Sequence, residues 1–512
     1  MTFYLGIDAG TQSLKAQLIE VDSGLVAAKA SVNFGQDLPE YQSPHGFIEN
    51  PDPVVRMADP CMWLDALDML LRKLQESGAP MGEIAGISGS GQQHGSVYLN
   101  AGFAPALARL DAERTLSEQL KPTLSRRLSP IWMDHSTSQE CAELTAEFGR
   151  RLQDDTGSPA VERFTGPQIH KFAGTEPKAY RETTVIHLVS SFLASVLAGK
   201  SMPIDYGDGA GMNLLNLHTL RWDADIVAFT APGLAEKLPD AVPSHTVCGA
   251  LSPYFAKYGL KPGTPLAVWS GDNPNSLGGT GAAETGMAVI SLGTSDTYFG
   301  SMPEFRTDPA GCGHVFGNPA GGFMSLICFS NGSLAREEVK KQCGVGWTFF
   351  DRTAGELTPP GNNGKLMLPY FVPENVPPVL KPGVRYNFDP TTAKPEERVR
   401  CIFESQAVSM YLHSRWMGVD TRRIRITGGA SASPVFRQIL ADVFQADVES
   451  IAVADSAALG AALRAANAVG KLDWATLYEK FCAAIETVKP IPANREIYRK
   501  LTEDYRKLEA RI

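Results

Sequence analysis

The sequence predicts an α/β chain made of two related halves. Residues 4–20 read as an apolar strand, a short polar turn and a return strand in which apolar residues alternate with polar ones. Residues 287–299 repeat this pattern far along the chain, again with small polar residues in the turn. Helical segments with one apolar face lie elsewhere in the chain, for example at 63–74, where leucines recur at helical spacing. Two hairpins of this kind indicate two halves that face one ligand across a cleft.

The composition limits the class of protein and its partners. The 512 residues suffice for two large domains, and a content of 43% hydrophobic and 20% charged residues is that of an ordinary globular protein. The net charge of −9 argues against nucleic acid or an anionic membrane as a partner. The eight cysteines form no Cys-x-x-Cys pair, so we expect them to be reduced. No segment is apolar for long enough to span a bilayer and the N-terminus lacks a signal-type segment, which predicts a cytoplasmic protein.

The turn of the first hairpin has the composition of a phosphate-binding loop. Gly10 gives the backbone freedom, and Thr11, Gln12 and Ser13 add small polar groups that can converge on a nucleotide phosphate. Asp8 ends the first strand, where it would hold Mg²⁺ near that phosphate through water. An ordinary surface hairpin is the alternative. The second hairpin at 287–299 favours phosphate binding.

Residues 87–99 read as a strand, a glycine-rich turn and another strand. The glycine spacing differs from Gly-x-Gly-x-x-Gly and no helix follows, which excludes a dinucleotide fingerprint. Gln92, Gln93 and His94 offer neutral hydrogen-bonding groups suited to a polyhydroxylated substrate, although a lone histidine is more often structural. The polar segment 101–130 is predicted to be a surface insertion.

The middle of the chain contains a candidate catalytic carboxylate. The Lys-Pro-Gly-Thr-Pro segment at 261–265 predicts a domain boundary, after a helix at 183–197. The next strand, 266–270, runs into Gly-Asp-Asn-Pro-Asn and then a helix of small residues. Asp272 thus ends a strand and begins a helix, a position where α/β proteins present catalytic carboxylates. A helix N-cap is the alternative.

A glycine pair near residue 428 has the character of a nucleotide site. Gly428 and Gly429 end a strand, and Ser433 then caps a helix that has Pro434 at its first position. The glycines let a flat ring approach the backbone and the helix N-terminus favours anions, so an adenosine or phosphate site is predicted here. The alanine-rich helix at 456–468 is predicted to pack close to a neighbour.

In this order the motifs resemble the FGGY family of carbohydrate kinases over nearly the whole chain. They are the first hairpin, the Gln-Gln-His-Gly turn, Trp132 to Asp134, the Gly-Asp-Asn segment, the second hairpin and the glycine pair. The resemblance implies two ribonuclease-H-like domains of the actin, Hsp70 and sugar-kinase superfamily, with ATP and sugar in the cleft between them. It assigns 1–260, joined by the C-terminal helices of 475–512, to the first domain and 261–474 to the second. One departure is that 165–172 and 179–181 lack the tryptophan that follows a lysine in the family signature.

The resemblance also implies roles for individual residues. Asp272 matches the catalytic base, which takes the proton of a sugar hydroxyl as that hydroxyl attacks the γ-phosphorus in line. The residues that match ketose-binding positions are His94, Arg163, Asp272 and Asn273. Those that match ATP-binding positions are Thr11, Gln12, Thr294 and Ser295 for the phosphates and Gly428, Gly429, Ala430, Ser433 and Trp347 for the nucleoside. Asp8 and Asp272 would fix Mg²⁺.

Several phrases resemble the branch of the family that phosphorylates D-xylulose, in its longer animal and fungal form. They are 88–98, 163–168, 188–194, 203–215, 270–275 and 291–297. This similarity implies ATP-dependent formation of D-xylulose 5-phosphate in pentose catabolism, by a monomer or homodimer. The alternatives are the same reaction on D-ribulose, L-ribulose or glycerol, and a non-kinase ATP-dependent module of the actin or Hsp70 type. The chain lacks P-loop and protein-kinase motifs.

Overall fold

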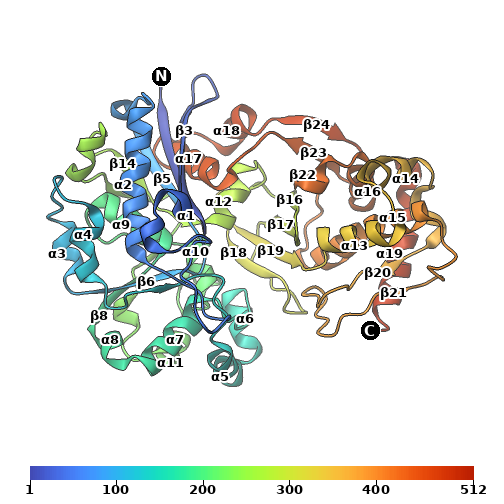
Figure 1. Ribbon diagram of the computed structural model, residues 1–512, viewed down its shortest axis with the longest axis horizontal. Helices are drawn as coiled ribbons and strands as arrows, with labels where there is room; N and C mark the ends of the chain where they lie inside the picture. Colours follow the sequence, from blue (N-terminus) through green and yellow to red (C-terminus); the bar gives the residue numbers. More distant parts are fainter. The chain divides into compact units, whose positions relative to one another are not determined.

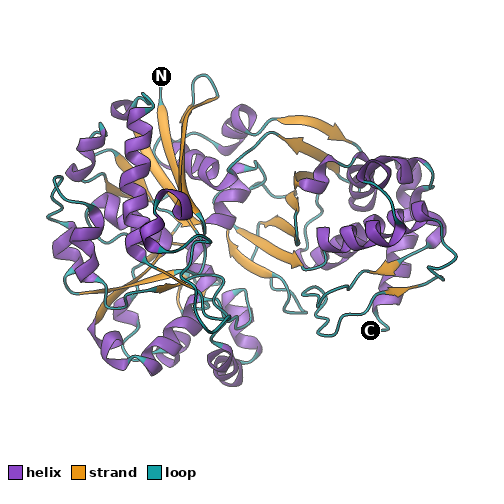
Figure 2. Cartoon of the chain, viewed as in Figure 1, coloured by secondary structure: helices purple, strands orange, loops and turns teal.

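The computed structural model describes residues 1–512, which form two compact α/β units (Figures 1 and 2). The N-terminal unit comprises Met1–Gly281, Val315–Phe323 and Val453–Cys482. The C-terminal unit comprises Ala282–His314, Met324–Ala452 and Ala483–Ile512. Each unit is built around a mixed sheet, which confirms the predicted fold class. None of the helices has the length and apolar character that crossing a bilayer requires.

The sheet of the N-terminal unit brings several strand ends to one edge. Its strands run in the order β13 (Val247–Ala250), β14 (Pro265–Ala267), β5 (Ile84–Gly91), β1 (Phe3–Ala9), β2 (Ser13–Glu20) and β3 (Leu25–Asn33), with β15 (Ser270–Gly271) beside β5. Strands β1 and β2 are the predicted first hairpin, and β1 and β15 run parallel to β5. Ser90 of β5 therefore lies between Asp8 of β1 and Ser270 of β15 in the register. The carboxyl ends of these three strands carry the candidate site.

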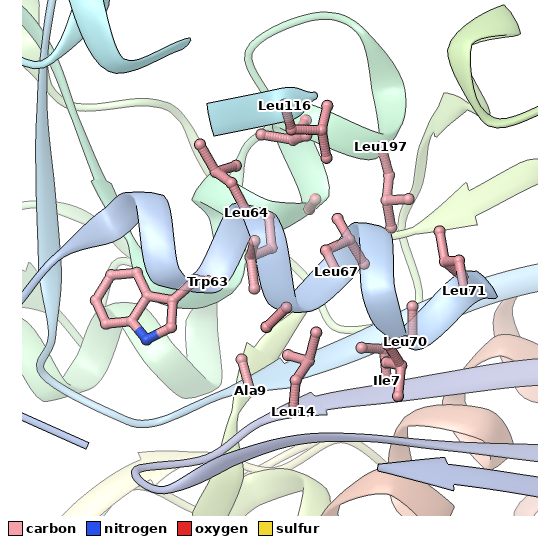
Figure 3. Packing of buried hydrophobic residues seen from close by; sticks show 14 of the residues in the cluster. Ile7, Ala9, Leu14, Trp63, Leu64, Leu67, Leu70, Leu71, Leu116 and Leu197 are labelled. Carbon is pink, nitrogen blue, oxygen red and sulfur yellow. The ribbon is translucent and has the colours of Figure 1, made fainter. Parts of the chain in front are cut away.

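Helix α2 (Pro60–Glu76) covers one face of this sheet. Asp59 caps the helix by accepting from the Cys61 N–H, and Pro60 takes the first helical position, where its missing N–H is not needed. Leu67 and Leu70 of the helix are fully buried in one core with residues of the hairpin, and Leu70 lies toward Ile7 of β1 (Figure 3). The leucine periodicity predicted this helix and its buried face. Burial of such apolar side chains is the main interaction that stabilises the packing of α2 on the sheet.

Helix α17 (Ser456–Ala468) packs on the sheet and on α12 (Asp272–Gly279) with almost no separation. A Cβ atom on Gly6 of β1 would lie 2.1 Å from the Ala458 carbonyl oxygen. A Cβ atom on Gly460 would lie 1.8 Å from the Asn275 carbonyl oxygen. Small residues are therefore required on both sides of these contacts. The close packing predicted for the alanine-rich segment is confirmed.

Other elements of the N-terminal unit surround this sheet. The paired short strands are β4 (Met57–Ala58) with β7 (Ser129–Pro130), β6 (Ser96–Asn100) with β8 (Thr183–Leu188), β9 (Ile204–Asp205) with β12 (Ala241–Val242), and β10 (Leu215–Asn216) with β11 (Arg221–Trp222). The helices are α1 (Phe34–Asp37), α3 (Phe103–Leu107), α4 (Leu116–Leu120), α5 (Ser138–Phe148), α6 (Arg150–Thr156), α7 (Thr165–Thr175), α8 (Pro177–Glu182), α9 (Val189–Ala198), α10 (Tyr206–Gly209), α11 (Ala224–Thr230) and α18 (Trp474–Phe481).

One local prediction was wrong, and another was incomplete. The segment predicted as a helix at 183–197 is divided, because Thr183–Leu188 is a strand and only Val189–Ala198 is helical. Its β-branched residues favour a strand once β6 supplies a partner. The insertion 101–130 is also more than a surface segment, since Leu116 at the start of α4 is fully buried in the core.

The C-terminal unit has its own sheet with helices around it. The sheet order includes β19 (Phe323–Phe329), β17 (Asp296–Met302), β16 (Met287–Leu292), β22 (Arg423–Gly428), β23 (Asp447–Ile451) and β24 (Ala484–Val488). The helices are α13 (Ser333–Cys343), α14 (Ala354–Glu356), α15 (Pro395–Ser414), α16 (Pro434–Phe444) and α19 (Arg495–Glu509). The irregular stretch before α15 carries only the short pair β20 (Met367–Leu368) and β21 (Arg385–Tyr386), and β18 (His314–Gly317) lies where the chain leaves the C-terminal unit.

The division into units differs from the boundary expected at residue 260. Residues up to 281 belong to the N-terminal unit. The segment 261–265 precedes β14, which pairs antiparallel with β13 of the same sheet, so its prolines and glycine mark a turn inside a domain. Asp272 is consequently in the N-terminal unit rather than at the start of the second domain.

The C-terminal helices also divide differently from the expectation for 475–512. Helix α18 stays with the N-terminal unit, whereas residues 483–512 belong to the C-terminal unit. In that unit the Tyr498 hydroxyl of α19 donates to Glu404 of α15 at 2.9 Å, and Arg400 donates to the Tyr498 oxygen at 3.0 Å. These buried bonds fix α19 on α15.

Candidate functional site

Two carboxylates meet at the edge of the N-terminal sheet. Asp8 lies near the end of β1 and Asp272 begins α12 directly after β15. Burial raises the pKa of Asp8 to about 6. Burial also raises the pKa of Asp272 to about 7, and the charge of Asp8 adds to that rise. The two groups are thus electrostatically coupled, and their ionised forms favour a cation nearby.

The arrangement fits a hydrated divalent cation. The Oδ1 atom of Asp8 is buried and has no hydrogen-bond partner. No group of three or more His, Cys, Asp or Glu side chains forms a complete metal cage in the chain. Mg²⁺ commonly binds one or two protein carboxylates and completes its coordination with water and substrate phosphates. Asp8 and Asp272 could supply those carboxylates.

A glutamine of the Gln-Gln-His-Gly turn organises the surroundings of Asp272. The Asn273 backbone N–H donates to the Asp272 Oδ1 atom at 2.9 Å, and the Asn273 side-chain amide donates to the same atom at 3.3 Å. The Gln93 side chain accepts from the Asn273 amide at 2.7 Å and donates to the Gly207 carbonyl oxygen at 3.3 Å. The sequence indicated Gln93 as a hydrogen-bonding residue of this turn suited to a polyhydroxylated substrate, and the structure adds its contact with Asn273 beside Asp272. Its only sequence signal was a neutral hydrogen-bonding side chain beside His94.

His94 and Arg163 lie around one aromatic ring. The His94 ring stacks on Phe164 with centroids 4.2 Å apart, and the Arg163 guanidinium carbon lies 5.7 Å from the centroid of the same ring. The His94 Nδ1 atom lies 2.8 Å from the Gly211 carbonyl oxygen, so Nδ1 carries a proton in this contact. The structure thus brings two of the predicted sugar-side residues together.

The first phosphate turn is held from two other parts of the chain. The Trp132 indole N–H donates to the Thr11 hydroxyl at 2.8 Å, and the Phe34 N–H donates to the Gln12 carbonyl oxygen at 3.0 Å. Gly46 has φ +85°, and a Cβ atom there would lie 1.8 Å from the Thr11 carbonyl oxygen. The turn therefore has a fixed shape. Trp132 remains 40% exposed.

The second phosphate turn, in the C-terminal unit, contains Thr294 and Ser295 between β16 and β17. Asp296 follows the turn and forms two hydrogen bonds with the Arg336 guanidinium, at 2.6 and 2.9 Å. Burial raises the pKa of Asp296, although the Arg336 charge opposes the rise. The Arg336 side chain also donates to Gln406 at 2.9 Å, which ties the turn to α15. This buried pair gives the hairpin a rigid base.

The predicted adenosine residues lie beside that turn in the same unit. Strand β22 runs parallel to β16, with Gly428 opposite Leu292. Gly428 has φ +87°, and a Cβ atom there would lie 2.3 Å from the Leu292 carbonyl oxygen, so glycine is required. Gly429 and Ala430 form the following turn, and Ser433 caps α16 by accepting from the Phe436 N–H at 3.3 Å. The glycine pair and the phosphate turn thus end adjacent parallel strands.

Trp347 is an exposed aromatic residue of the C-terminal unit, with 46% of its surface accessible. The Lys340 ammonium lies 4.5 Å from the centroid of its ring, and Phe350 packs edge-on at 5.5 Å. Phe350 contacts Phe403, which in turn stacks on Phe436 of α16. This chain of aromatic contacts joins Trp347 to the helix that Ser433 caps.

Two segments of the chain match the two domain models of one protein family. The N-terminal domain of the FGGY family of carbohydrate kinases matches residues 124–279, and the C-terminal domain of that family matches residues 288–469. Xylulose kinase 2 of Arabidopsis thaliana is 39% identical over 489 residues, covering 91% of this chain and 87% of that protein. Xylulose kinase of Rattus norvegicus is 38% identical over 524 residues, covering 99% of this chain and 96% of that protein.

Solved structures show the same fold. The xylulose kinase of Rhodospirillum rubrum superposes with a TM-score of 0.83 at 22% identity, covering 99% of this chain and 98% of that chain. Plasmodium falciparum glycerol kinase with ADP superposes with a TM-score of 0.79 at 16% identity, covering 100% of this chain and 98% of that chain. The solved structures thus share the fold of two ribonuclease-H-like domains. The two family models and the relatives that are 38–39% identical over most of the chain show that the chain belongs to the FGGY family of carbohydrate kinases.

Proposed function

We propose that the protein transfers the γ-phosphoryl group of ATP to D-xylulose and produces D-xylulose 5-phosphate and ADP. The observation that carries this proposal is the position of Asp272, at a strand end near the charge of Asp8 and hydrogen-bonded to Asn273, whose amide also donates to Gln93. The choice of D-xylulose rests on relatives named xylulose kinase, which are 38–39% identical over most of the chain.

In the proposed reaction Asp272 is the general base. It takes the proton of the 5-hydroxyl group while that oxygen bonds to the γ-phosphorus, and the bond from phosphorus to the β,γ-bridging oxygen breaks to release ADP. A pKa of about 7 suits a base that works near neutral pH. Asp8 and Asp272 would hold Mg²⁺, which supplies positive charge to the phosphate oxygens. Positioning and charge neutralisation provide most of the catalysis in phosphoryl transfer.

The sugar is bound by His94, Arg163 and Asn273 in this proposal. Phe164 holds His94 and Arg163 on one ring, and Gln93 fixes the Asn273 amide. Together these side chains supply the donors and acceptors that a ketose with several hydroxyl groups needs.

The residues proposed to bind ATP are those that match the family's nucleotide-binding positions. Thr11 and Gln12 of the first turn and Thr294 and Ser295 of the second bind its phosphates. Gly428, Gly429, Ala430 and Ser433 bind the adenosine, and Trp347 contacts the base. The fixed shapes of both turns and the exposed Trp347 ring support these assignments.

The protein is proposed to act in the cytoplasm as a monomer or homodimer. All eight cysteines are free in the structure, which is typical of a reducing compartment. The second candidate is the same reaction on another ketose or polyol. A glycerol kinase has the same fold, and one fold with similar phosphate-binding loops can serve several acceptors.

Replacement of Asp272 tests the proposed base. We expect Asp272→Ala to lower kcat by about 10²- to 10⁴-fold, the contribution of a general base, while ADP still binds with an unchanged Kd in calorimetry. Glu83→Ala, at an exposed carboxylate of the same unit, is the matched control and should retain activity. Loss of ADP binding in Asp272→Ala, or full activity of that variant, would refute the assignment.

A further inference from the structure

Asp205 is a fully buried carboxylate of the N-terminal unit that has no direct part in the proposed reaction. It ends β9, and its Oδ1 atom accepts from the Ser244 hydroxyl at 2.6 Å. Its Oδ2 atom accepts from the Ser270 hydroxyl and from the Gly207 N–H, the latter at 3.0 Å. A buried carboxylate is costly unless such bonds satisfy it, so Asp205 joins three separate segments firmly.

One of these segments leads directly to the proposed base. Ser270 and Gly271 form β15, and Asp272 follows as the first residue of α12. Strand β15 pairs with the end of β5, and the Asn275 amide donates to the Gly271 carbonyl oxygen at 3.1 Å. The Ser270 hydroxyl therefore attaches the backbone to Asp205 only two residues before Asp272, and the pairing with β5 and the Asn275 hydrogen bond hold the same stretch of backbone.

Arg464 supplies the counter-charge for Asp205. It lies on α17 with 1% of its surface exposed, and its Nη1 atom is 3.4 Å from Asp205 Oδ1. None of its guanidinium nitrogens makes a hydrogen bond, so its partner is the charge of Asp205. Helix α17 is the helix that packs on α12 through Gly460 and Asn275. Arg464 thus lies on α17, the helix that packs against α12, and α12 begins at Asp272.

Asp208 shows that these charges are close enough to interact. Burial raises the pKa of Asp208 to about 8, the charges of Asp205 and Asp272 add to the rise, and Arg464 opposes it. Arg464 is thus a cation that acts on both Asp205 and Asp208. Removal of Arg464 would therefore leave these two buried carboxylates without that positive charge.

We propose that Asp205 is a positioning residue, which fixes Asp272 for catalysis through the Ser270 hydroxyl, with Arg464 as its counter-ion. This inference rests on the proposed role of Asp272 as the base. Asp205 itself does not touch the substrate. Small displacements of a reacting group lower the rate strongly, and an error of 1 Å can cost about 10²-fold. Loss of the Ser270 anchor should therefore affect kcat rather than binding.

Two serine variants separate positioning from a merely structural role. Ser270→Ala and Ser244→Ala each remove one buried hydroxyl that donates to the same carboxylate, but only Ser270 belongs to the strand before Asp272. We expect Ser270→Ala to lower kcat about tenfold while KM for sugar and for ATP changes less than about twofold. Ser244→Ala should keep kcat within about twofold of wild type, with a similar loss of thermal stability.

Hydrogen exchange provides a readout that does not need activity. Peptides covering 268–276 should exchange faster in Ser270→Ala than in Ser244→Ala, because the anchor of β15 is lost. If the wild-type protein phosphorylates another polyol, kcat is compared on that polyol. If it phosphorylates no polyol, the proposed function is wrong, and Asp205 then has no role in positioning a catalytic base. Faster exchange in Ser270→Ala than in Ser244→Ala would in that case still show that the Ser270 hydroxyl holds β15. Equal effects of the two variants on kcat and on exchange would overturn the positioning role.

A charge variant tests the part played by Arg464. Asp205→Asn should lower both stability and kcat, because it leaves a buried guanidinium without its counter-charge. The double variant Asp205→Asn/Arg464→Met should recover stability relative to Asp205→Asn, as measured by the melting temperature. A double variant less stable than either single variant would contradict the pairing.

Discussion

Asp272→Asn should make the protein more stable when no ligand is bound, and the gain should grow with pH. The pKa of Asp272 is raised by burial and by the charge of Asp8. An acid with a raised pKa binds its proton more tightly in the folded state than in the unfolded state, so its ionisation destabilises the fold. That destabilisation begins as the pH rises above the unfolded value of 3.8 and is complete above about 7. An amide carries no such charge.

The size of the effect follows from the two pKa values. A value of about 7 in the fold against 3.8 in the unfolded chain corresponds to about 4 kcal/mol, at about 1.4 kcal/mol for each pKa unit. This is an upper limit, because the side chain keeps some exposure to solvent. About 3 kcal/mol of it should develop between pH 5 and pH 8, since over that range the carboxyl group is already ionised in the unfolded chain while it changes from protonated to ionised in the fold.

Urea unfolding at pH 5 and pH 8 measures this prediction, in buffer with a chelator and without nucleotide or sugar. Tryptophan fluorescence reports mainly on the N-terminal unit, which holds five of the seven tryptophans, namely Trp63, Trp132, Trp222, Trp269 and Trp474. Glu83→Gln, an exposed carboxylate changed to an amide, is the control and should show no pH-dependent gain. A stability difference between Asp272→Asn and wild type that is the same at both pH values would refute the reasoning.

Three further predictions concern packing and the two phosphate turns. Leu67→Ala should lower the free energy of unfolding by about 3–5 kcal/mol through a cavity under α2, whereas Leu25→Ala, at a side chain 63% exposed, should change it by less than about 0.5 kcal/mol in urea unfolding. Arg336→Met leaves the Asp296 carboxylate buried without its partner and should cost about 3–5 kcal/mol by the same measurement; an unchanged midpoint would show that the pair contributes little. Trp132→Phe removes the hydrogen bond to the first phosphate turn and should raise KM for ATP about fivefold, the equivalent of about 1 kcal/mol; an unchanged KM would contradict a role for this bond.

Regular patterns in the sequence predicted the parts of the fold that depend on neighbouring residues. Alternation in residues 4–20 predicted the first hairpin, and leucine spacing predicted α2. The step from strand to helix at Asp272 was also visible, because the two elements are adjacent in sequence. Such local signals carry over into the structure because period and side-chain direction are properties of each element.

Contacts between distant segments were outside the reach of these patterns. Asp205 meets Ser270 across 65 positions, and Trp132 meets Thr11 across 121. Arg464 stood in an alanine-rich helix that indicated close packing and gave no sign of a buried ion pair. The segment 261–265 has the composition of a linker, but pairing of the flanking strands makes it a turn within one sheet. In each case tertiary contacts, rather than local composition, decided the outcome.

A coupled assay of ATP-to-ADP conversion with Mg²⁺, run across ketoses and polyols, tests the central claim most directly. The account predicts the largest kcat/KM for D-xylulose, with D-ribulose, L-ribulose and glycerol clearly lower. A maximum at one of those other acceptors would contradict the proposed substrate while leaving Asp272 as the base. Absence of turnover with every acceptor would contradict the proposed kinase reaction itself.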